Sequence, residues 1–592
     1  MSATAADPGS PLRGTEVVSG PAPSPFPALA AIELFEAQAG RHPGRTAVTG
    51  PDGASMTYAE LDRTAEGFAA ILEERGAGGA FVALCADPAP AAIAAILGIW
   101  KAGAVWVPLH PDQPPARLAR QLAECGARWC FADGPASGTF SFGTAERLPL
   151  RAPRTRGRRK RTVPEPTSIA YGIFTSGSTG EPKLALLRHD SLVNYTMFVW
   201  QELLGGEEGL RFATPSSLAA DLGHTCLFPA LASGGTLEIP GRDVSRDATL
   251  FCGFLREREI DVLKIVPSHF AALSNAGADP APRRLLVFGG EPLPPELARA
   301  AAARCPIVNH YGPTETTVGA LFHRFVPSAV AVASVPIGRP IANVRAYVLD
   351  EHDRPAAPGS AGELWIGGVA VGEGYLGRPE ESGRRFREDP FFPGGRVYRT
   401  GDRVRTLPDG SIDFLGRIDD QVKIRGHRVE PGEAAAILRR HPAVARAAVA
   451  VQRTSAEPRL VAAVVPRAGE SVAADTLREF LAGELPEAWI PARIAVVDEL
   501  PLAASGKVDL GRLAESAAST PGRPRNAVEE WIAGIWSEIL GIPEPGVDDN
   551  FFALGGHSLA AMRIMARLRR EIPAALPLPA IFRNPTVASL AA

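Results

Sequence analysis

The chain has 592 residues, enough for several domains, and its 45% hydrophobic content excludes a largely disordered protein. Its 62 Lys and Arg residues nearly balance its 65 Asp and Glu residues, so no overall charge recruits nucleic acid or an anionic membrane. No apolar run reaches the roughly 18 residues of a membrane span, the N-terminus lacks a signal-peptide pattern and the six cysteines lack metal-ligand spacing, so we expect a soluble, cytoplasmic protein.

The first two segments differ sharply in composition. Residues 1–28 are rich in Pro, Gly, Ser and Ala without a periodic apolar face, which is typical of a flexible tail or linker. From Ala30, helix-like segments such as AELDRTAEGFAAILEERGA alternate with short apolar runs such as FVALCA. This alternation is typical of βαβ units and predicts a large α/β domain over residues 29–417.

The remainder of the chain predicts two smaller units. The segment LPDGSIDFLGRIDDQVKIRGHRVEP has a DG turn between alternating strands, and the helical EAAAILRRHP follows it closely. We expect a small α/β lobe over residues 418–518 and, from the composition of STPGRPRN, a linker over 519–525. VEEWIAGIWSEIL then shows helical apolar spacing, which predicts a helical domain over residues 526–592.

A loop rich in Ser, Gly and Thr follows the apolar run SIAYGIF. Glycine lets backbone N–H groups approach phosphate oxygens, hydroxyls add donors and a lysine adds positive charge. The spacing differs from that of a Walker loop, and such a loop alone is more often an ordinary turn. The candidate phosphate-binding residues are Thr175, Ser176, Gly177, Ser178, Thr179, Gly180 and Lys183.

Eight motifs, this loop among them, together support its interpretation as a phosphate-binding loop. In chain order they are MTYAEL, KAGAVWVPL, TSGSTGEPK, NHYGPTE, GELWIGG, YRTGD, GRIDDQVKIRGHRVE and PLAASGKVD. With DNFFALGGHSL near the C-terminus, the chain from about Ala30 to Ala592 resembles an adenylation domain fused to a peptidyl carrier domain of a nonribosomal peptide synthetase. The resemblance implies an α/β fold of the ANL superfamily, with a large lobe, a small lobe that rotates between two half-reactions, and a four-helix carrier domain.

The resemblance also implies the nucleotide site. Tyr311 is expected to stack on adenine, and Asp402 to accept the ribose hydroxyls, since a carboxylate offers only acceptors. Thr314 and Glu315 are expected at the phosphates, with Glu315 as the Mg²⁺ ligand, and Arg417 at the nucleotide. Other implied roles are catalysis by Thr175, Glu315, Lys183 and Lys507, and a hinge at Asp419, with Asp420 as the alternative.

Ser558 precedes the helical segment LAAMRIMARLRR and is by itself a good helix N-cap. Here the whole surrounding string is similar to a carrier attachment site. The resemblance therefore implies that 4′-phosphopantetheine is attached to Ser558 and accepts the activated acid as a thioester.

The resemblance places the following residues at the substrate: Asp221, Leu222, Thr225, Lys264, Val287, Gly289, His310, Val318 and Gly319, together with Lys507. Asp221 is expected to hold the substrate amine. Lys264 and His310 are basic, and a substrate side-chain carboxylate would pair with them both. The set resembles the aspartate pattern of the family, so we expect L-aspartate, or a 3-substituted aspartate with room beside Gly289 and Gly319.

The expected activity is ATP-dependent adenylation of aspartate and its transfer to the thiol on Ser558, in a freestanding loading didomain. Expected partners are a phosphopantetheinyl transferase and a condensation or tailoring enzyme acting in trans, with a small activator protein as a further candidate. Three alternatives stay open: another amino acid, an acyl-acid or aryl-acid ligase of the same superfamily, and a carrier scaffold loaded in trans. Two departures from the family pattern are Leu184 after Lys183, and Ala220 where an aromatic residue usually precedes Asp221.

Overall fold

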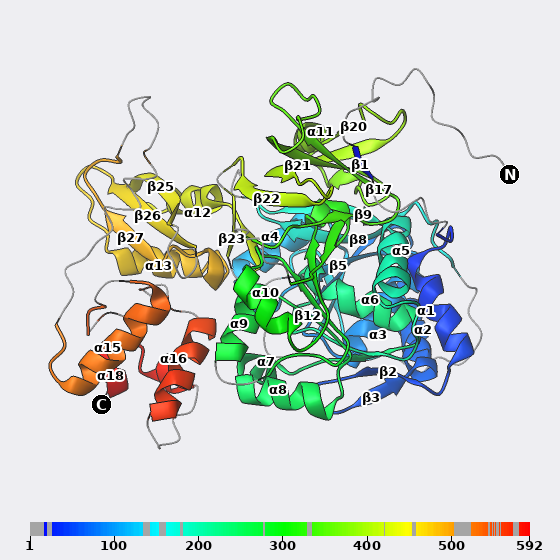
Figure 1. Ribbon diagram of the computed structural model, residues 1–592, viewed down its shortest axis with the longest axis horizontal. Helices are drawn as coiled ribbons and strands as arrows, with labels where there is room; N and C mark the ends of the chain where they lie inside the picture. The colour runs from blue at the N-terminus through cyan, green and yellow to red at the C-terminus, as the bar shows by residue number, and fades with distance from the viewer. Residues whose placement is uncertain are drawn as a thin grey trace.

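The computed structural model (Figure 1) describes residues 17–19, 26–133, 142–152, 162–177, 181–275, 279–327, 334–419, 421–424, 426–452, 458–501, 509, 523–542, 545–547, 549, 551, 554, 556, 558–571 and 579–591. The order of its elements confirms the expected α/β fold with a small lobe and a helical carrier domain. The largest hydrophobic core lies in the large lobe, and the small lobe and the carrier domain each have a core of their own.

Two mostly parallel sheets build the large lobe. The nine-stranded sheet has the order β16-β15-β14-β13-β12-β10-β11-β2-β3, with β16 Arg339–Pro340, β15 Leu321–Arg324, β14 Ile307–Tyr311, β13 Leu285–Gly289, β12 Val262–Ile265, β10 Arg211–Ala213, β11 Thr236–Glu238, β2 Thr46–Thr49 and β3 Ser55–Thr57. The seven-stranded sheet has the order β19-β9-β8-β5-β4-β6-β7, with β19 Gly374–Tyr375, β9 Lys183–Arg188, β8 Ile169–Thr175, β5 Val105–Leu109, β4 Phe81–Cys85, β6 Trp129–Ala132 and β7 Glu146–Leu148. Buried strands of this kind read as continuous apolar runs, as FVALC does.

Helices pack between and around these sheets. They are α1 Ala31–Arg41, α2 Tyr58–Glu73, α3 Pro90–Lys101, α4 Pro115–Cys125, α5 His189–Phe198, α6 His224–Ala232, α7 Arg242–Arg246, α8 Ala248–Glu257, α9 Pro267–Asn275 and α10 Pro295–Ala302, with the short turns η2 Val199–Leu203, η3 Asp221–Gly223 and η4 Thr314–Thr316. Thr57 and Glu60 form a capping box that starts α2. All but one residue of α3 is buried, which explains why this helix is apolar on every side.

A third sheet revises the expectation for the N-terminal segment. It contains β1 Val17–Ser19, β17 Val344–Leu349, β18 Ala361–Gly368, β21 Arg396–Thr406, β20 Phe386–Glu388 and β22 Ile412–Arg417, with α11 Pro379–Arg385 between β19 and β20. Val17–Ser19 pairs antiparallel with β17, where Val17 is opposite Tyr347. Composition predicted an unstructured tail here. It could not reveal that Val17–Ser19 pairs with a strand more than 300 positions away in the sequence.

The small lobe consists of a hairpin and a three-stranded sheet with helices. Its elements are β23 Val422–Ile424, β24 His427–Val429, α12 Pro431–Leu438, β25 Val444–Gln452, β26 Arg459–Pro466, α13 Ala474–Ala482, η5 Glu487–Trp489 and β27 Arg493–Val496. The hairpin β23–β24 reaches the large lobe, whereas the sheet of β25, β26 and β27 lies beside it (Figure 1).

The carrier domain contributes α15 Ala527–Leu540, α16 Ser558–Glu571, α17 Pro579–Arg583 and α18 Val587–Ala591 in the described part of the chain. Its core surrounds Trp536, which is completely buried. Helix α16 packs against α9 of the large lobe, so the carrier domain lies beside the adenylation lobes (Figure 1). None of the helices in the described ranges is long and apolar enough to cross a membrane.

Candidate active site

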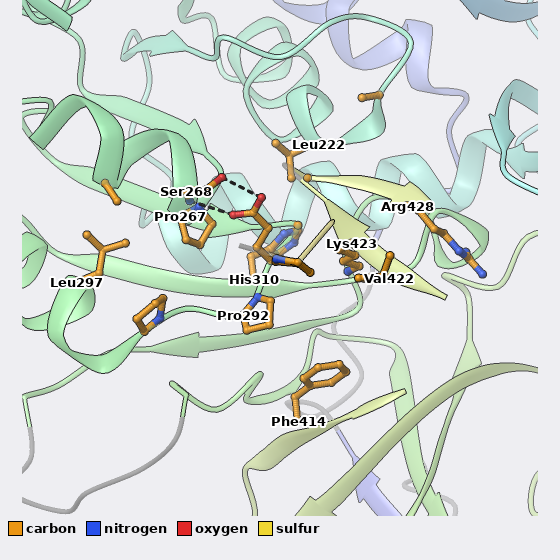
Figure 2. A pocket seen from close by; sticks show the side chains of 18 of the residues that line it. Leu222, Pro267, Ser268, Pro292, Leu297, His310, Phe414, Val422, Lys423 and Arg428 are labelled. Atoms are coloured by element: carbon orange, nitrogen blue, oxygen red, sulfur yellow. Dashed lines mark hydrogen bonds between the residues drawn. The ribbon is translucent and has the colours of Figure 1, made fainter. Parts of the chain in front are cut away.

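A cavity of about 970 Å³ lies at the carboxyl ends of β12, β13 and β14 and is covered by the β23–β24 hairpin. In Figure 2 its wall includes Leu222, His310, Val422 and Lys423. Ser268, which also lines the cavity, donates from its backbone and its hydroxyl to the Glu291 carboxylate at 2.9 Å. Ligands of open α/β sheets bind outside the carboxyl ends of strands, so the fold itself points to this cavity.

Asp221 forms the first polar point of the cavity. It lies in η3, and its Oδ2 atom has no hydrogen-bond partner among the residues that the structure describes. Burial raises the pKa of this carboxyl to about 6, although Thr314 and the more distant Lys423 and Lys264 oppose the rise. A buried carboxylate without a partner is costly, so a cationic group is its natural complement.

Lys264 and His310 form the second polar point. Both line the cavity and both are buried, and Nζ of Lys264 donates to Nδ1 of His310 at 3.0 Å and to the Phe288 carbonyl at 3.2 Å. Burial lowers the pKa of Lys264 to about 7. An ammonium has three N–H donors, so a protonated Lys264 retains one beyond these two partners.

The other ring nitrogen of His310 is also engaged. Its Nε2 lies 3.2 Å from the hydroxyl of Tyr195, which lies 2.7 Å from Oγ1 of Thr225. The pKa of His310 is well below its usual value because of burial and the nearby Lys264. His310 is therefore neutral and donates through Nε2 when Lys264 donates to Nδ1, so neither nitrogen remains for a substrate. The sequence suggested two donors to the substrate, but this geometry leaves only Lys264.

The two glycines explain how these basic side chains fit. A Cβ atom on Gly289 would lie 2.4 Å from Nζ of Lys264, and one on Gly319 would lie 1.7 Å from Nε2 of His310. The space beside both glycines is thus filled by the basic pair. It does not provide the room for a substrate substituent that the sequence suggested.

The other expected pocket residues divide into two groups. Leu222 and Val318 line the cavity. Thr225 and Val287 are completely buried behind the wall, where Thr225 contacts Tyr195 rather than the cavity. Tyr195 itself was missed by sequence reasoning, because nothing in its local pattern distinguishes it from a core aromatic residue.

The expected nucleotide residues are close to one another. The hydroxyl of Tyr311 donates to Asp402, and Nη1 of Arg417 donates to the same carboxylate at 2.8 Å. Arg417 also pairs with Asp419, at 2.8 and 2.6 Å. Nζ of Lys423, a residue that sequence reasoning did not single out, lies 5.6 Å from the ring centre of Tyr311.

Both lobes provide hydrogen-bond donors to the Glu315 carboxylate. Nη1 of Arg428 donates to its two oxygens at 2.9 and 2.7 Å, and the hydroxyl of Tyr375 donates at 2.7 Å. Burial opposes ionisation of Glu315, but these partners outweigh it and hold the pKa at about 2. The carboxylate suits Mg²⁺ chemically, yet in this lobe arrangement it does not fit the ion, because both oxygens are paired.

Lys183 and the start of the phosphate loop are also engaged. Nζ of Lys183 lies 2.5 Å from Glu381, and Oγ of Ser176 donates to the Arg428 carbonyl at 3.1 Å. Thr175 and Gly177 lie beside them, at the end of β8 and in the following loop. Ser178, Thr179, Gly180, Lys507 and Asp420 lie outside the described residues, and Ser558 is described as the first residue of α16.

Comparison with protein families decides the assignment. Residues 35–376 match the AMP-binding enzyme model, residues 433–507 match the AMP-binding enzyme C-terminal domain and residues 530–592 match the phosphopantetheine attachment site. The chain belongs to the AMP-binding enzymes. It combines the adenylating lobes of that family with a carrier domain, and its cofactors are ATP, Mg²⁺ and 4′-phosphopantetheine.

Individual relatives are nonribosomal peptide synthetases. The chain is 36% identical to tyrocidine synthase 3 of Brevibacillus parabrevis over 575 residues, and 37% identical to surfactin synthase subunit 2 of Bacillus subtilis (strain 168) over 581 residues. These matches include 95% and 94% of this AMP-binding enzyme but only 9% and 16% of the relatives. The chain thus spans a small part of the curated relatives that it matches.

Two solved structures are similar to this chain over almost its whole length. Holo-PA1221, a nonribosomal peptide synthetase protein with adenylation and carrier domains bound to a vinylsulfonamide inhibitor, superposes with a TM-score of 0.82 at 27% identity over 95% of this chain and 96% of that chain. Holo-AB3403, a four-domain synthetase bound to AMP and glycine, gives a TM-score of 0.60 at 29% identity over 95% of this chain and 43% of that chain.

Proposed function

We propose that this AMP-binding enzyme activates L-aspartate with ATP and transfers the aspartyl group to the phosphopantetheine thiol on Ser558. The observation that carries the proposal is the pair of opposite charges in one cavity: a carboxylate on Asp221 whose Oδ2 atom has no partner among the described residues, and a buried amine on Lys264 with one free donor position. An amino acid with a second carboxylate complements both groups at once.

The residues of the cavity would orient the substrate before reaction. Asp221 would bind the ammonium group and Lys264 the side-chain carboxylate, since both line the cavity, and this leaves the α-carboxylate for the reaction with ATP. Since the substrate's own ionised carboxylate attacks the α-phosphorus, no general base is needed. Lys183 and Lys507 would offset the repulsion between the anions as pyrophosphate leaves, and bound Mg²⁺ would supply further positive charge to the phosphates.

Nucleotide binding would use the cluster of Tyr311, Asp402 and Arg417, with Thr314 at the phosphates. The two acceptor oxygens of Asp402 suit the two ribose hydroxyls. The ribose hydroxyls of ATP would replace Tyr311 and Arg417 on Asp402, and these contacts keep the carboxylate oriented until the nucleotide binds.

Other acids are disfavoured on stated grounds. Glutamate is longer by one methylene, and one methylene changes the free energy of transition-state binding by about 1–3 kcal/mol in a fitted pocket. Asparagine loses the charge-assisted bond to Lys264. A 3-substituted aspartate finds no space beside Gly289 or Gly319. An aryl or acyl acid lacks the amine that would pair with the Asp221 carboxylate.

The proposal extends to partners. A phosphopantetheinyl transferase would prime Ser558, and a condensation or tailoring enzyme would take the aspartyl group onward. A carrier scaffold loaded in trans is the competing function, and the intact cluster at Asp402 together with the cavity that reaches the carrier domain favours self-loading.

Pyrophosphate exchange across all amino acids and a set of aryl acids tests the substrate. We expect the highest kcat/KM with L-aspartate. Intact-mass measurement of the primed protein with ATP and aspartate tests self-loading, and we expect one aspartyl addition on the carrier. Selection of an acid without an amine, or the absence of any addition, would overturn the respective half of the proposal.

A further inference from the structure

The two lobes meet at a buried ion pair, and its carboxylate, Glu433, also accepts from the backbone of Gly177 in the phosphate loop. Nη1 of Arg117 on α4 lies 2.6 Å from Oε1 of Glu433 on α12, and the two side chains are only 3% and 1% exposed. The Arg117 guanidinium also lies 4.4 Å from the ring centre of Trp489 in the small lobe. Since its partners belong to the other lobe, this burial exists only while the lobes keep their present orientation.

The same orientation closes the phosphate site. Arg428 of the small lobe occupies both oxygens of Glu315, and its carbonyl accepts a hydrogen bond from Ser176. Glu315 and Ser176 are therefore not available to ATP with its Mg²⁺ until the hairpin β23–β24 withdraws, so the present orientation is not the one that receives ATP.

The same orientation also opens a route to the carrier. The cavity that holds Asp221 and His310 extends to Pro458 and to Arg563 of α16. Helix α16 packs against α9, and Ser558 is its first residue. This orientation therefore suits the transfer of the activated acid to the carrier, which is the second half-reaction.

We propose that Arg117 and Glu433 form an ion pair that exists only in the transfer orientation and holds the small lobe in it. They act as positioning residues for the second half-reaction, Arg117 through Trp489 and Glu433. A buried charge that loses its partner is strongly destabilising. A single substitution at Arg117 or Glu433 therefore destabilises this orientation selectively, because the remaining charge is buried only here. A second interlobe pair, Arg120 with Glu484, lies on the same face of α4 and is only partly buried.

The test compares the two half-reactions in one protein. Glu433→Gln and Arg117→Met should each reduce the rate of carrier loading relative to pyrophosphate exchange at least tenfold. The double variant Arg117→Met with Glu433→Leu should recover most of that ratio, because apolar partners remove both unpaired charges. Arg75→Met, which breaks an exposed pair with Glu146 inside the large lobe, should leave the ratio unchanged. The assay uses whichever amino acid exchanges best, so it does not depend on aspartate.

A distance measurement separates orientation from activity. The six native cysteines are buried, so spin labels at Arg384→Cys on the large lobe and Glu470→Cys on the small lobe report the lobe orientation. Glu433→Gln should deplete the distance that matches the present orientation, and the apolar double variant should restore it. An unchanged distance distribution and an unchanged ratio in folded single variants would overturn the proposal. If those variants do not fold, Arg117→Lys takes their place, because it keeps the charge but loses the guanidinium contacts with Glu433 and Trp489. A lowered ratio with a depleted distance in Arg117→Lys supports the proposal, and values equal to those of Arg75→Met overturn it.

Discussion

Nζ of Lys264 donates a hydrogen bond of 3.0 Å to Nδ1 of His310, so one basic side chain of the cavity orients the other. The chain of contacts continues from His310 to Tyr195 and Thr225. Under the proposed function, recognition of an acidic substrate would depend on this buried network rather than on two independent cations, and the network makes predictions that differ from those of a simple charged pocket.

Tyr195→Phe should weaken aspartate activation without touching the substrate. The variant removes the hydroxyl that contacts Nε2 of His310, a loss of about 1 kcal/mol and roughly fivefold in kcat/KM. KM for aspartate should rise, whereas KM for ATP should stay the same. Steady-state pyrophosphate exchange measures both, and an equal loss for the two substrates would show that Tyr195 serves only the general packing of the core.

The pH dependence of aspartate activation should be narrow. Binding requires ionised Asp221, whose raised pKa of about 6 makes activity rise as pH increases through that value. It also requires protonated Lys264, whose lowered pKa of about 7 makes activity fall as pH increases further. We expect a bell-shaped profile of kcat/KM for aspartate with its maximum between these values. A flat profile from pH 5 to pH 9 would contradict the assigned charge states.

Gly319→Ala should abolish the preference for aspartate while the protein still folds. The new methyl group would lie 1.7 Å from Nε2 of His310 and would displace the ring that supports Lys264. Gly383→Ala is the matched control, because a Cβ atom there meets no atom within 4 Å. Thermal unfolding checks the fold, and exchange with a panel of amino acids checks the preference. Retention of the aspartate preference in Gly319→Ala would place the ring elsewhere.

Ser558→Ala should separate the two half-reactions. The hydroxyl is the expected attachment point, so the variant should show no mass addition from a phosphopantetheinyl transferase. Pyrophosphate exchange should stay within about twofold of the unchanged protein, because Ser558 begins a helix outside the large lobe. Priming of the variant would move the attachment site to another residue.

Local motifs allowed the proposed nucleotide site to be predicted from sequence. Tyr311, Asp402 and Arg417 come from three motifs, and the structure brings their side chains together. Ser558 begins a helix of the carrier domain, as its motif indicated. Such motifs predict local structure well, because strand ends and turns depend mainly on adjacent residues.

Long-range relationships could not be read in this way. Arg117 and Glu433 are separated by 316 positions and meet only through the packing of two lobes. Val17–Ser19 forms a strand only because β17 offers a free edge. The sequence also could not show that both nitrogens of His310 are engaged, because Tyr195 comes from α5, more than 100 residues upstream.

The measurement closest to the central claim is the ratio of kcat/KM for aspartate to that for asparagine, in the unchanged protein and in Lys264→Met. Loss of a buried charge-assisted pair costs about 3 kcal/mol, so the ratio should fall roughly 100-fold in the variant, with KM for ATP unchanged. If the ratio is the same in both proteins, Lys264 does not bind the side-chain carboxylate and the assignment of aspartate is wrong.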